Sequence, residues 1–187
     1  MEISFIRHGE SLLTEKNKMT ATEFKKWVER YNDHGVFENS SYPAAALEKA
    51  AAAFLVITSD LKRSIESARL LNPAAKIISD PLFRETELPI DLPKLLNIKL
   101  KPNTWSVSLR LLWLCGYSNE CESLNQAKSR AVKASQQLIH YANEYESIVL
   151  VGHGFFNRLI AKELQKKGWQ SKRKVTAKHW SCITYTF

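Results

Sequence analysis

The chain has 187 residues, of which 44% are hydrophobic and 25% charged, with a formal net charge of +8. This composition excludes global disorder, and no apolar run approaches the roughly 20 residues of a membrane-spanning helix. The length suits one well-buried domain, so we expect a single domain over residues 1–187. The first residues do not have the pattern of a secretory signal, which predicts a cytoplasmic location and no membrane association.

The first half of the chain alternates apolar runs with amphipathic segments, which predicts alternating strands and helices. In chain order these are a strand over Ile3–Ile6, helices over 20–31 and 44–53, a strand over Phe54–Ile57, a helix capped by Ser59, Asp60 and Leu61 and ending at Leu71, and an edge strand at Lys76–Ile78.

The second half begins with Asp80–Pro93, a polar segment with prolines that we expect to be irregular and to supply site residues. Residues 104–114 are apolar on nearly all sides, which indicates a buried helix or a cap over the mouth of the site. The remaining expected elements are a helix over 123–145, a strand over Ser147–Val151, a helix over 155–167 and a strand over Trp180–Phe187. This alternation predicts an α/β fold, a three-layer sandwich with a mostly parallel central sheet.

Two of the predicted strands end in a histidine beside glycine. The strand Ile3–Ile6 leads into Arg7-His8-Gly9, and Ser147–Val151 leads into Gly152-His153-Gly154. Because α/β sheets bind ligands at the carboxyl ends of their parallel strands, we expect the two histidines to converge on one pocket. A histidine beside an arginine in such a place is a candidate nucleophile.

Charge and cysteine content narrow the possible partners. Part of the basic excess lies near the C-terminus, at residues 166–167 and 172–174. Such charge suits small phosphorylated substrates as well as nucleic acid, and no nucleic-acid-binding motif accompanies it. We therefore expect a small phosphorylated substrate and no nucleic acid. The spacing of Cys115, Cys121 and Cys182 indicates reduced structural thiols and no metal site.

Four segments of the chain together resemble the histidine phosphatase superfamily, the group that includes the phosphoglycerate mutases. They are Arg7–Ser11, Ser59–Ala68, Phe83–Glu85 and Val151–Gly154, which stand in the family's order. Four matches with compatible spacing are much more specific than one. The resemblance implies a phosphoglycerate-mutase-like fold and chemistry through a phosphohistidine, without a cofactor or a metal.

The resemblance also implies a role for each matching residue. His8 is the expected nucleophile, and Glu85 the expected donor of a proton to the leaving oxygen. The second histidine of the catalytic set, His153, is expected to bind phosphoryl oxygens together with Arg7 and Arg63. Arginine suits this task because its planar guanidinium can bind two oxygens at once.

Three further residues with a carboxyl or amide group are candidates for supporting or alternative roles. Glu87 is the alternative proton donor, although the family register favours Glu85. Glu122 lies in a Cys-Glu-Ser segment similar to the family's Gly-Glu-Ser, and we expect it to orient a catalytic histidine. Asn17 is the candidate for an additional phosphate contact. The family's Gly-x-Trp-x-Gly segment after the acid, which normally supplies substrate contacts, is absent. The resemblance therefore does not identify the substrate.

Some of the histidines can also be explained by a purely structural role. Taken alone, His8 is equally well explained as a buried core residue, but His153 and Arg63 make that interpretation less favourable. Three other histidines lack a matching context and are expected to be structural or exposed: His34, His140 and His179.

These residues favour a metal-independent phosphomonoesterase that hydrolyses small phosphate esters. A phosphoglycerate-type mutase is the alternative within the same fold, because the sequence does not show whether water or a bound acceptor takes the phosphoryl group. The short chain has little room for insertions that close over an acceptor, which favours the phosphatase. A catalytically weak phosphate-binding module is the second alternative, and the retained chemical groups argue against it. The oligomeric state is not indicated.

Overall fold

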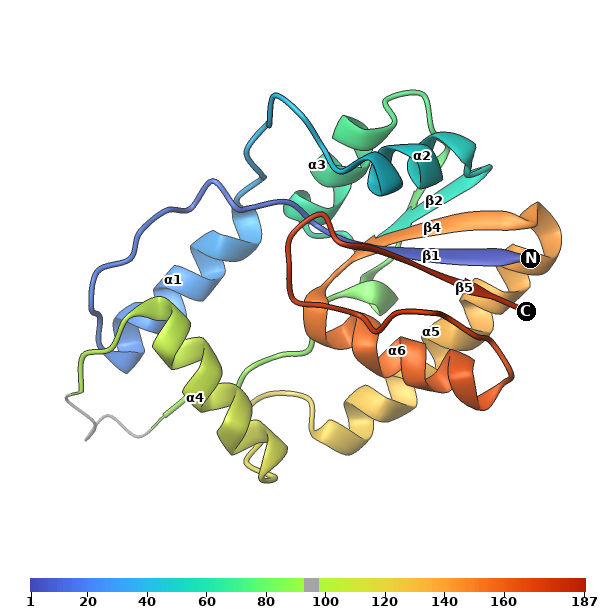
Figure 1. The fold of residues 1–187 in the computed structure, drawn as a ribbon. Coiled ribbons are helices and arrows are strands. Elements are labelled where there is room, and N and C mark those ends of the chain that lie inside the picture. The colour runs from blue at the N-terminus through green and yellow to red at the C-terminus, as the bar shows by residue number, and fades with distance from the viewer. Residues whose placement is uncertain (93–97) are drawn as a thin grey trace.

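The computed structural model describes residues 1–92 and 98–187, and the strands in this part of the chain form a five-stranded sheet (Figure 1). They are β1 (Glu2–Arg7), β2 (Leu55–Thr58), β3 (Ile77–Ser79), β4 (Ser147–Gly152) and β5 (Cys182–Thr186). The order is β3-β2-β4-β1-β5, with β5 antiparallel to β1 and the other pairs parallel. The expected mostly parallel sheet is confirmed, with β3 at one edge.

Helices cover both faces of this sheet. The α-helices of the described residues are α1 (Ala21–Asp33), α2 (Ala44–Ala52), α3 (Lys62–Leu71), α4 (Pro102–Leu114), α5 (Leu124–Tyr145) and α6 (Gly154–Lys166). Figure 1 shows α2 and α3 on one face and α5 and α6 on the other, so the fold has the expected three layers. Each face has its own cluster of buried apolar side chains.

Helices α1 and α4 lie beyond the sheet, on the side toward which β1 runs from the N-terminus (Figure 1). Between them is a third apolar cluster that contains Phe24, Trp27 and Trp105. The opposite face of α4 is exposed at Val107 and Leu111, so the expectation of a buried helix is wrong. The alternative, a cap over the mouth of the site, stays a prediction. Apolar composition alone does not decide which side of a helix receives a partner.

The start of α3 also differs from the prediction. Ser59, Asp60 and Leu61 were expected to cap it, but Leu61 is the N-cap residue and no side chain caps the helix. Asp60 instead forms an ion pair with Arg84, and the Ser59 hydroxyl contacts His153 at 2.7 Å. These polar side chains bond to residues from distant segments, which a local capping rule does not anticipate.

The segment that follows β3 is irregular, as expected. It contains a single 3-10 turn, Pro81–Phe83, within its described part, residues 80–92. Pro93, the last residue of the predicted irregular segment, lies outside the described residues. Among the helices of the described chain, none combines the length and apolarity needed to cross a membrane.

Candidate active site

The parallel pairing of β1 with β4 brings the two histidine motifs together. Arg7, the last residue of β1, lies opposite Gly152, the last residue of β4. His8 and His153 follow these residues directly, and the centroids of their rings are 5.1 Å apart. Both strands end on the side of the sheet where α1 and α4 lie (Figure 1). The predicted convergence of the two histidines is thus present in the fold.

The hydrogen bond made by His8 determines its tautomer. Its Nδ1 lies 2.8 Å from the carbonyl oxygen of Gly9, and a carbonyl can only accept, so Nδ1 carries the proton. Burial lowers the pKa of His8 well below its ordinary value, and the neighbouring His153, Arg63 and Arg7 lower it further. The imidazole is therefore neutral near pH 7, with the Nε2 lone pair available for nucleophilic attack.

His153 is fully buried. Its hydrogen-bonded ring nitrogen is Nε2, whereas that of His8 is Nδ1. The Ser59 hydroxyl accepts a hydrogen bond from the Leu61 amide at 3.4 Å and forms a hydrogen bond with Nε2 of His153, 2.7 Å away. Nδ1 of His153 is buried and has no partner within the described residues. Burial, with Arg63 and Arg7, holds the pKa of His153 well below its ordinary value. The ring of His153 is therefore neutral near pH 7, and its Nδ1 is free to bind a ligand.

Two arginines, Arg7 and Arg63, lie beside the two histidines. Arg63 is buried, donates through Nη1 to the Tyr31 carbonyl and to Asn32 Oδ1, and stacks on the Tyr31 ring. The Nε atoms of Arg63 and Arg7 are both buried without a partner in the described part of the chain. Burial lowers the pKa of each arginine, whereas Tyr31 and Glu85 raise it. Such fixed guanidinium groups suit an anionic ligand.

Glu85 reaches this site from the irregular segment after β3. Its Oε2 accepts a hydrogen bond from the Phe155 amide at 3.0 Å, and its Oε1 accepts one from the Phe156 amide at 2.9 Å. These amides belong to the first turn of α6, which begins directly after His153. The positive end of the helix thus holds the carboxyl beside the second histidine.

Glu85 and Glu87 occupy different surroundings. The charge of Glu85 raises the pKa of Arg7 and of Arg63. Glu87 is exposed, and its Oε2 accepts a hydrogen bond from the backbone amide of Glu122 at 2.9 Å. Of the two carboxylates, the fold thus brings Glu85 and not Glu87 to the histidine cluster.

Glu122 has a different partner from the one that the sequence suggested. Its carboxylate accepts two hydrogen bonds from Arg130, and the side chains of both residues are largely buried. Arg130 also donates to the carbonyls of Leu82 and Arg84, at 2.8 and 2.9 Å, just before Glu85. This geometry corrects the expected role, because the Glu122 carboxylate pairs with the arginine that holds the segment before Glu85, and it makes no hydrogen bond to a histidine within the described residues.

The structure does not bring Asn17 to the cluster. The side chain is exposed on the connection between β1 and α1, close to Met19, whose backbone pairs with Leu100. No hydrogen bond within the described residues joins Asn17 to the histidines or arginines of the site.

Two residues without a sequence signal lie beside the site. His179 donates from Nδ1 to the carbonyl oxygen of His8 at 2.9 Å, and the two rings are 5.4 Å apart. Arg110 donates to the carbonyls of Thr86 and Glu87, at 2.8 and 3.2 Å, and so holds the other end of the segment that carries Glu85. Neither residue stands in a local motif, and both reach the site through packing between distant segments.

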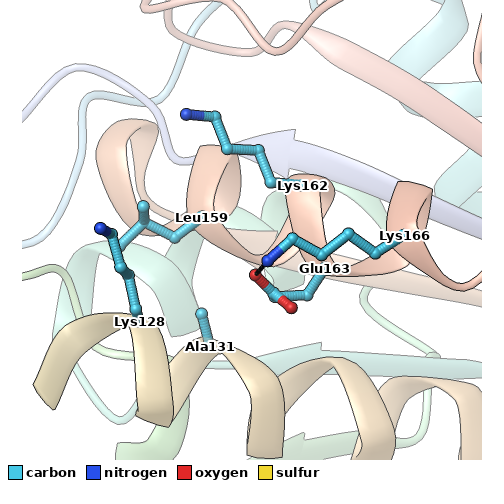
Figure 2. Close-up of a pocket in the computed structure, with 6 residues that line it drawn as sticks. All are labelled: Lys128, Ala131, Leu159, Lys162, Glu163 and Lys166. Atoms are coloured by element: carbon cyan, nitrogen blue, oxygen red, sulfur yellow. Dashed lines mark hydrogen bonds and ion pairs between the residues drawn. The ribbon is translucent and has the colours of Figure 1, made fainter. Parts of the chain in front are cut away.

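Two surface cavities lie apart from this cluster. One, with a volume of about 160 Å³, lies between α5 and α6 and is lined by Lys128, Ala131, Leu159, Lys162, Glu163 and Lys166 (Figure 2). The other, of about 500 Å³, lies between α1 and the connection that precedes it. None of the predicted site residues lines either cavity. The cluster at the strand ends is compact and buried, with His8 only 3% exposed.

The family model of the histidine phosphatase superfamily (branch 1) matches residues 3–187. The chain belongs to this superfamily. The resemblance of its four segments is thereby confirmed, and the protein is an enzyme of the phosphatase type. A search of curated proteins gives no match to this superfamily member.

Solved structures agree with this assignment at the level of the fold. A mycobacterial glucosyl-3-phosphoglycerate phosphatase is 19% identical, with a TM-score of 0.57, covering 88% of this chain and 79% of that one. The protein of a Mycobacterium tuberculosis open reading frame is 15% identical, with a TM-score of 0.60 and coverages of 100% and 91%. A phosphoserine phosphatase of Entamoeba histolytica, in complex with 3-phosphoglyceric acid, has 15% identity, a TM-score of 0.59 and coverages of 100% and 90%.

The burial of two neutral histidines makes the stability depend on pH. Because the folded pKa values of His8 and His153 are depressed, below about pH 6.5 the unfolded chain binds protons that the folded chain excludes. Each histidine should therefore lower the free energy of unfolding by about 1.4 kcal/mol for each pH unit below that point. Urea denaturation between about pH 7 and pH 5 measures this slope. The double variant His8→Asn, His153→Asn should show a flatter slope, and an unchanged slope would contradict the interpretation.

The ion pair between Glu122 and Arg130 should affect catalysis through the position of Glu85. We expect Glu122→Gln and Arg130→Met each to lower kcat for phosphate esters about tenfold, with a smaller effect on KM, because the acid loses its placement. The double variant should lose little more than either single variant, since both changes break the same support. Steady-state phosphate release measures these rates, and additive losses would show that the two residues act separately.

Proposed function

We propose that this protein is a metal-independent phosphomonoesterase that hydrolyses small phosphate esters through a phosphohistidine at His8. The observation that carries the proposal is a neutral His8 with its Nε2 lone pair free, beside three buried nitrogen atoms that have no partner within the described residues: Nε of Arg7, Nε of Arg63 and Nδ1 of His153. A phosphoryl group supplies the acceptor oxygens that such donors require. We assign the activity to one domain over residues 1–187.

The proposed reaction has two steps. In the first, Nε2 of His8 attacks phosphorus, and the ester oxygen leaves with a proton from Glu85. Arg7, Arg63 and His153 donate hydrogen bonds to the other phosphoryl oxygens, which carry the charge of the transition state. In the second, water attacks the phosphohistidine and gives a proton to Glu85. Inorganic phosphate leaves, and both residues return to their starting protonation states.

The hydrogen bond from His8 to the Gly9 carbonyl supports this sequence of steps. Attack through Nε2 makes the imidazole ring positive, and the proton on Nδ1 already points at a carbonyl oxygen 2.8 Å away. That oxygen stabilises the positive ring without a further proton transfer. The same bond holds the ring in one orientation.

The names of the structural relatives support hydrolysis rather than isomerisation. Two of them are phosphatases, for glucosyl-3-phosphoglycerate and for phosphoserine, and the latter structure contains 3-phosphoglyceric acid. We therefore propose a small phosphorylated metabolite as substrate, with no nucleic acid and no cofactor. Within residues 1–92 and 98–187, no group of three His, Cys, Asp or Glu side chains is arranged to hold a metal ion. A mutase would return an isomer of the substrate, and a binding module would return the substrate unchanged.

The first test is phosphate release from a panel of small phosphomonoesters in the presence of a chelator. We expect the native enzyme to remain active under these conditions, and His8→Ala to lose activity by at least about a thousandfold because the nucleophile is gone. His140→Ala, which changes an exposed histidine on α5, serves as the matched control. Activity that persists in His8→Ala would overturn the assignment of the nucleophile. Release of an isomer without inorganic phosphate would support the mutase.

The role of Glu85 can be tested through the leaving group. We expect Glu85→Gln to lower kcat/KM about a hundredfold or more for an alkyl phosphate, whose alkoxide needs a proton to leave. The loss should be much smaller for 4-nitrophenyl phosphate, because its phenolate leaves without protonation. Glu87→Gln is the matched control and should leave both values near those of the native enzyme. A larger loss in Glu87→Gln would exchange the two assignments.

A further inference from the structure

His179 lies against the nucleophile but has no role in the reaction described above. The segment before β5 carries it, and its imidazole is half-buried. The centroid of its ring is 5.4 Å from that of His8, and the planes of the two rings are inclined by 52°. A third imidazole therefore borders the phosphate-binding cluster formed by His8, His153 and the two arginines.

One hydrogen bond assigns the protonation of this ring. Nδ1 of His179 lies 2.9 Å from the backbone carbonyl oxygen of His8, which can only accept, so Nδ1 carries a proton. No hydrogen bond in the described part of the chain engages Nε2. In the neutral ring Nε2 is an acceptor, and protonation of the ring turns it into a charged donor.

Backbone contacts fix the position of this histidine relative to the nucleophile. The amide of Trp180 donates to the carbonyl of Arg7 at 3.0 Å, and the amide of Arg7 donates to the carbonyl of Ser181 at 3.1 Å. The buried Trp180 ring also occupies the space that a β-carbon on Gly9 would need, at 2.2 Å. His179 is thus held by the same stretch of backbone that carries the nucleophile.

The charges around His179 connect its protonation to an anion in the site. His8 and Arg7 approach it from the end of β1, Glu10 from the connection that follows, and Lys178 precedes it on its own segment. Burial lowers the pKa of His179, and the positive charge of Arg7 lowers it further, whereas Glu10 raises it. A bound oxyanion would offset the charge of Arg7 and so favour the protonated ring.

We infer that His179 is an additional oxyanion-binding residue of this site, which donates a hydrogen bond from Nε2 to the bound phosphoryl group when its ring is protonated. The inference rests on the proposed function, since it assigns His179 to the same phosphate pocket. It makes the affinity for dianionic ligands greater in acid. The nucleophile keeps its neutral form over the same pH range, because the pKa of His8 lies well below its ordinary value.

Two amide substitutions separate this role from a structural one. Asn has a side-chain N–H near the position of Nδ1, so His179→Asn keeps the bond to the His8 carbonyl and removes Nε2. Gln places its N–H near the position of Nε2, so His179→Gln keeps that donor and loses the other. His140→Asn changes an exposed histidine of α5 and is the matched control.

The probe is sulfate, whose double negative charge does not change between about pH 5 and pH 8, so that any pH dependence of its binding belongs to the protein. Isothermal titration calorimetry should show that the native protein and His140→Asn bind sulfate more weakly as the pH rises. For His179→Asn we expect binding about tenfold weaker at the acid end and nearly independent of pH. His179→Gln should also lose the pH dependence while binding more tightly than the Asn variant.

Three outcomes would overturn the inference: sulfate binding by the native protein that does not depend on pH, a pH dependence in His179→Asn like that of the native protein, or weakened binding in the Gln variant alone. The first needs no variant and so holds even if a substitution prevents folding. Failure of the proposed function is a separate result. A protein with sulfate binding that depends on His179, but with no phosphate release from any ester, would refute the phosphatase and keep the oxyanion site.

Discussion

The parallel pairing of β1 with β4 is the constraint on which the rest of the site depends. Because Arg7 lies opposite Gly152, the two following histidines must leave the sheet at the same edge. The β2 strand, paired with β4 on its other side, delivers Ser59 to the same place. The core on both faces of the sheet holds this register, since a slip by one residue would turn every buried side chain to the opposite face.

Burial governs the chemistry at this edge. The same low-dielectric surroundings that keep His8 and His153 neutral also make unpaired guanidinium groups costly, and Glu85 and Tyr31 partly offset that cost around Arg63. A bound phosphoryl group would offset the rest of this cost, because its negative oxygens can accept hydrogen bonds from the guanidinium groups. Stability and activity are therefore linked, because the groups that would bind phosphate are those whose burial disfavours folding in acid.

Support for these groups comes from outside the strand ends. The α6 amides and the pair Glu122–Arg130 hold the segment that carries Glu85, whereas the segment before β5 brings His179 against His8. Each support joins segments that are distant in the sequence. Glu85 and His8 are thus held in place by different parts of the chain.

By itself, the sequence determined the order and type of the elements, to within two residues at their ends, because hydrophobic period and turn residues act locally. It also indicated His8 and His153, since each lies in a short motif at a strand end. Only the tertiary structure decided the partner of Glu122, the exposed face of α4 and the place of His179. These depend on which distant segments pack together, and such packing leaves no periodic or motif signal in the chain.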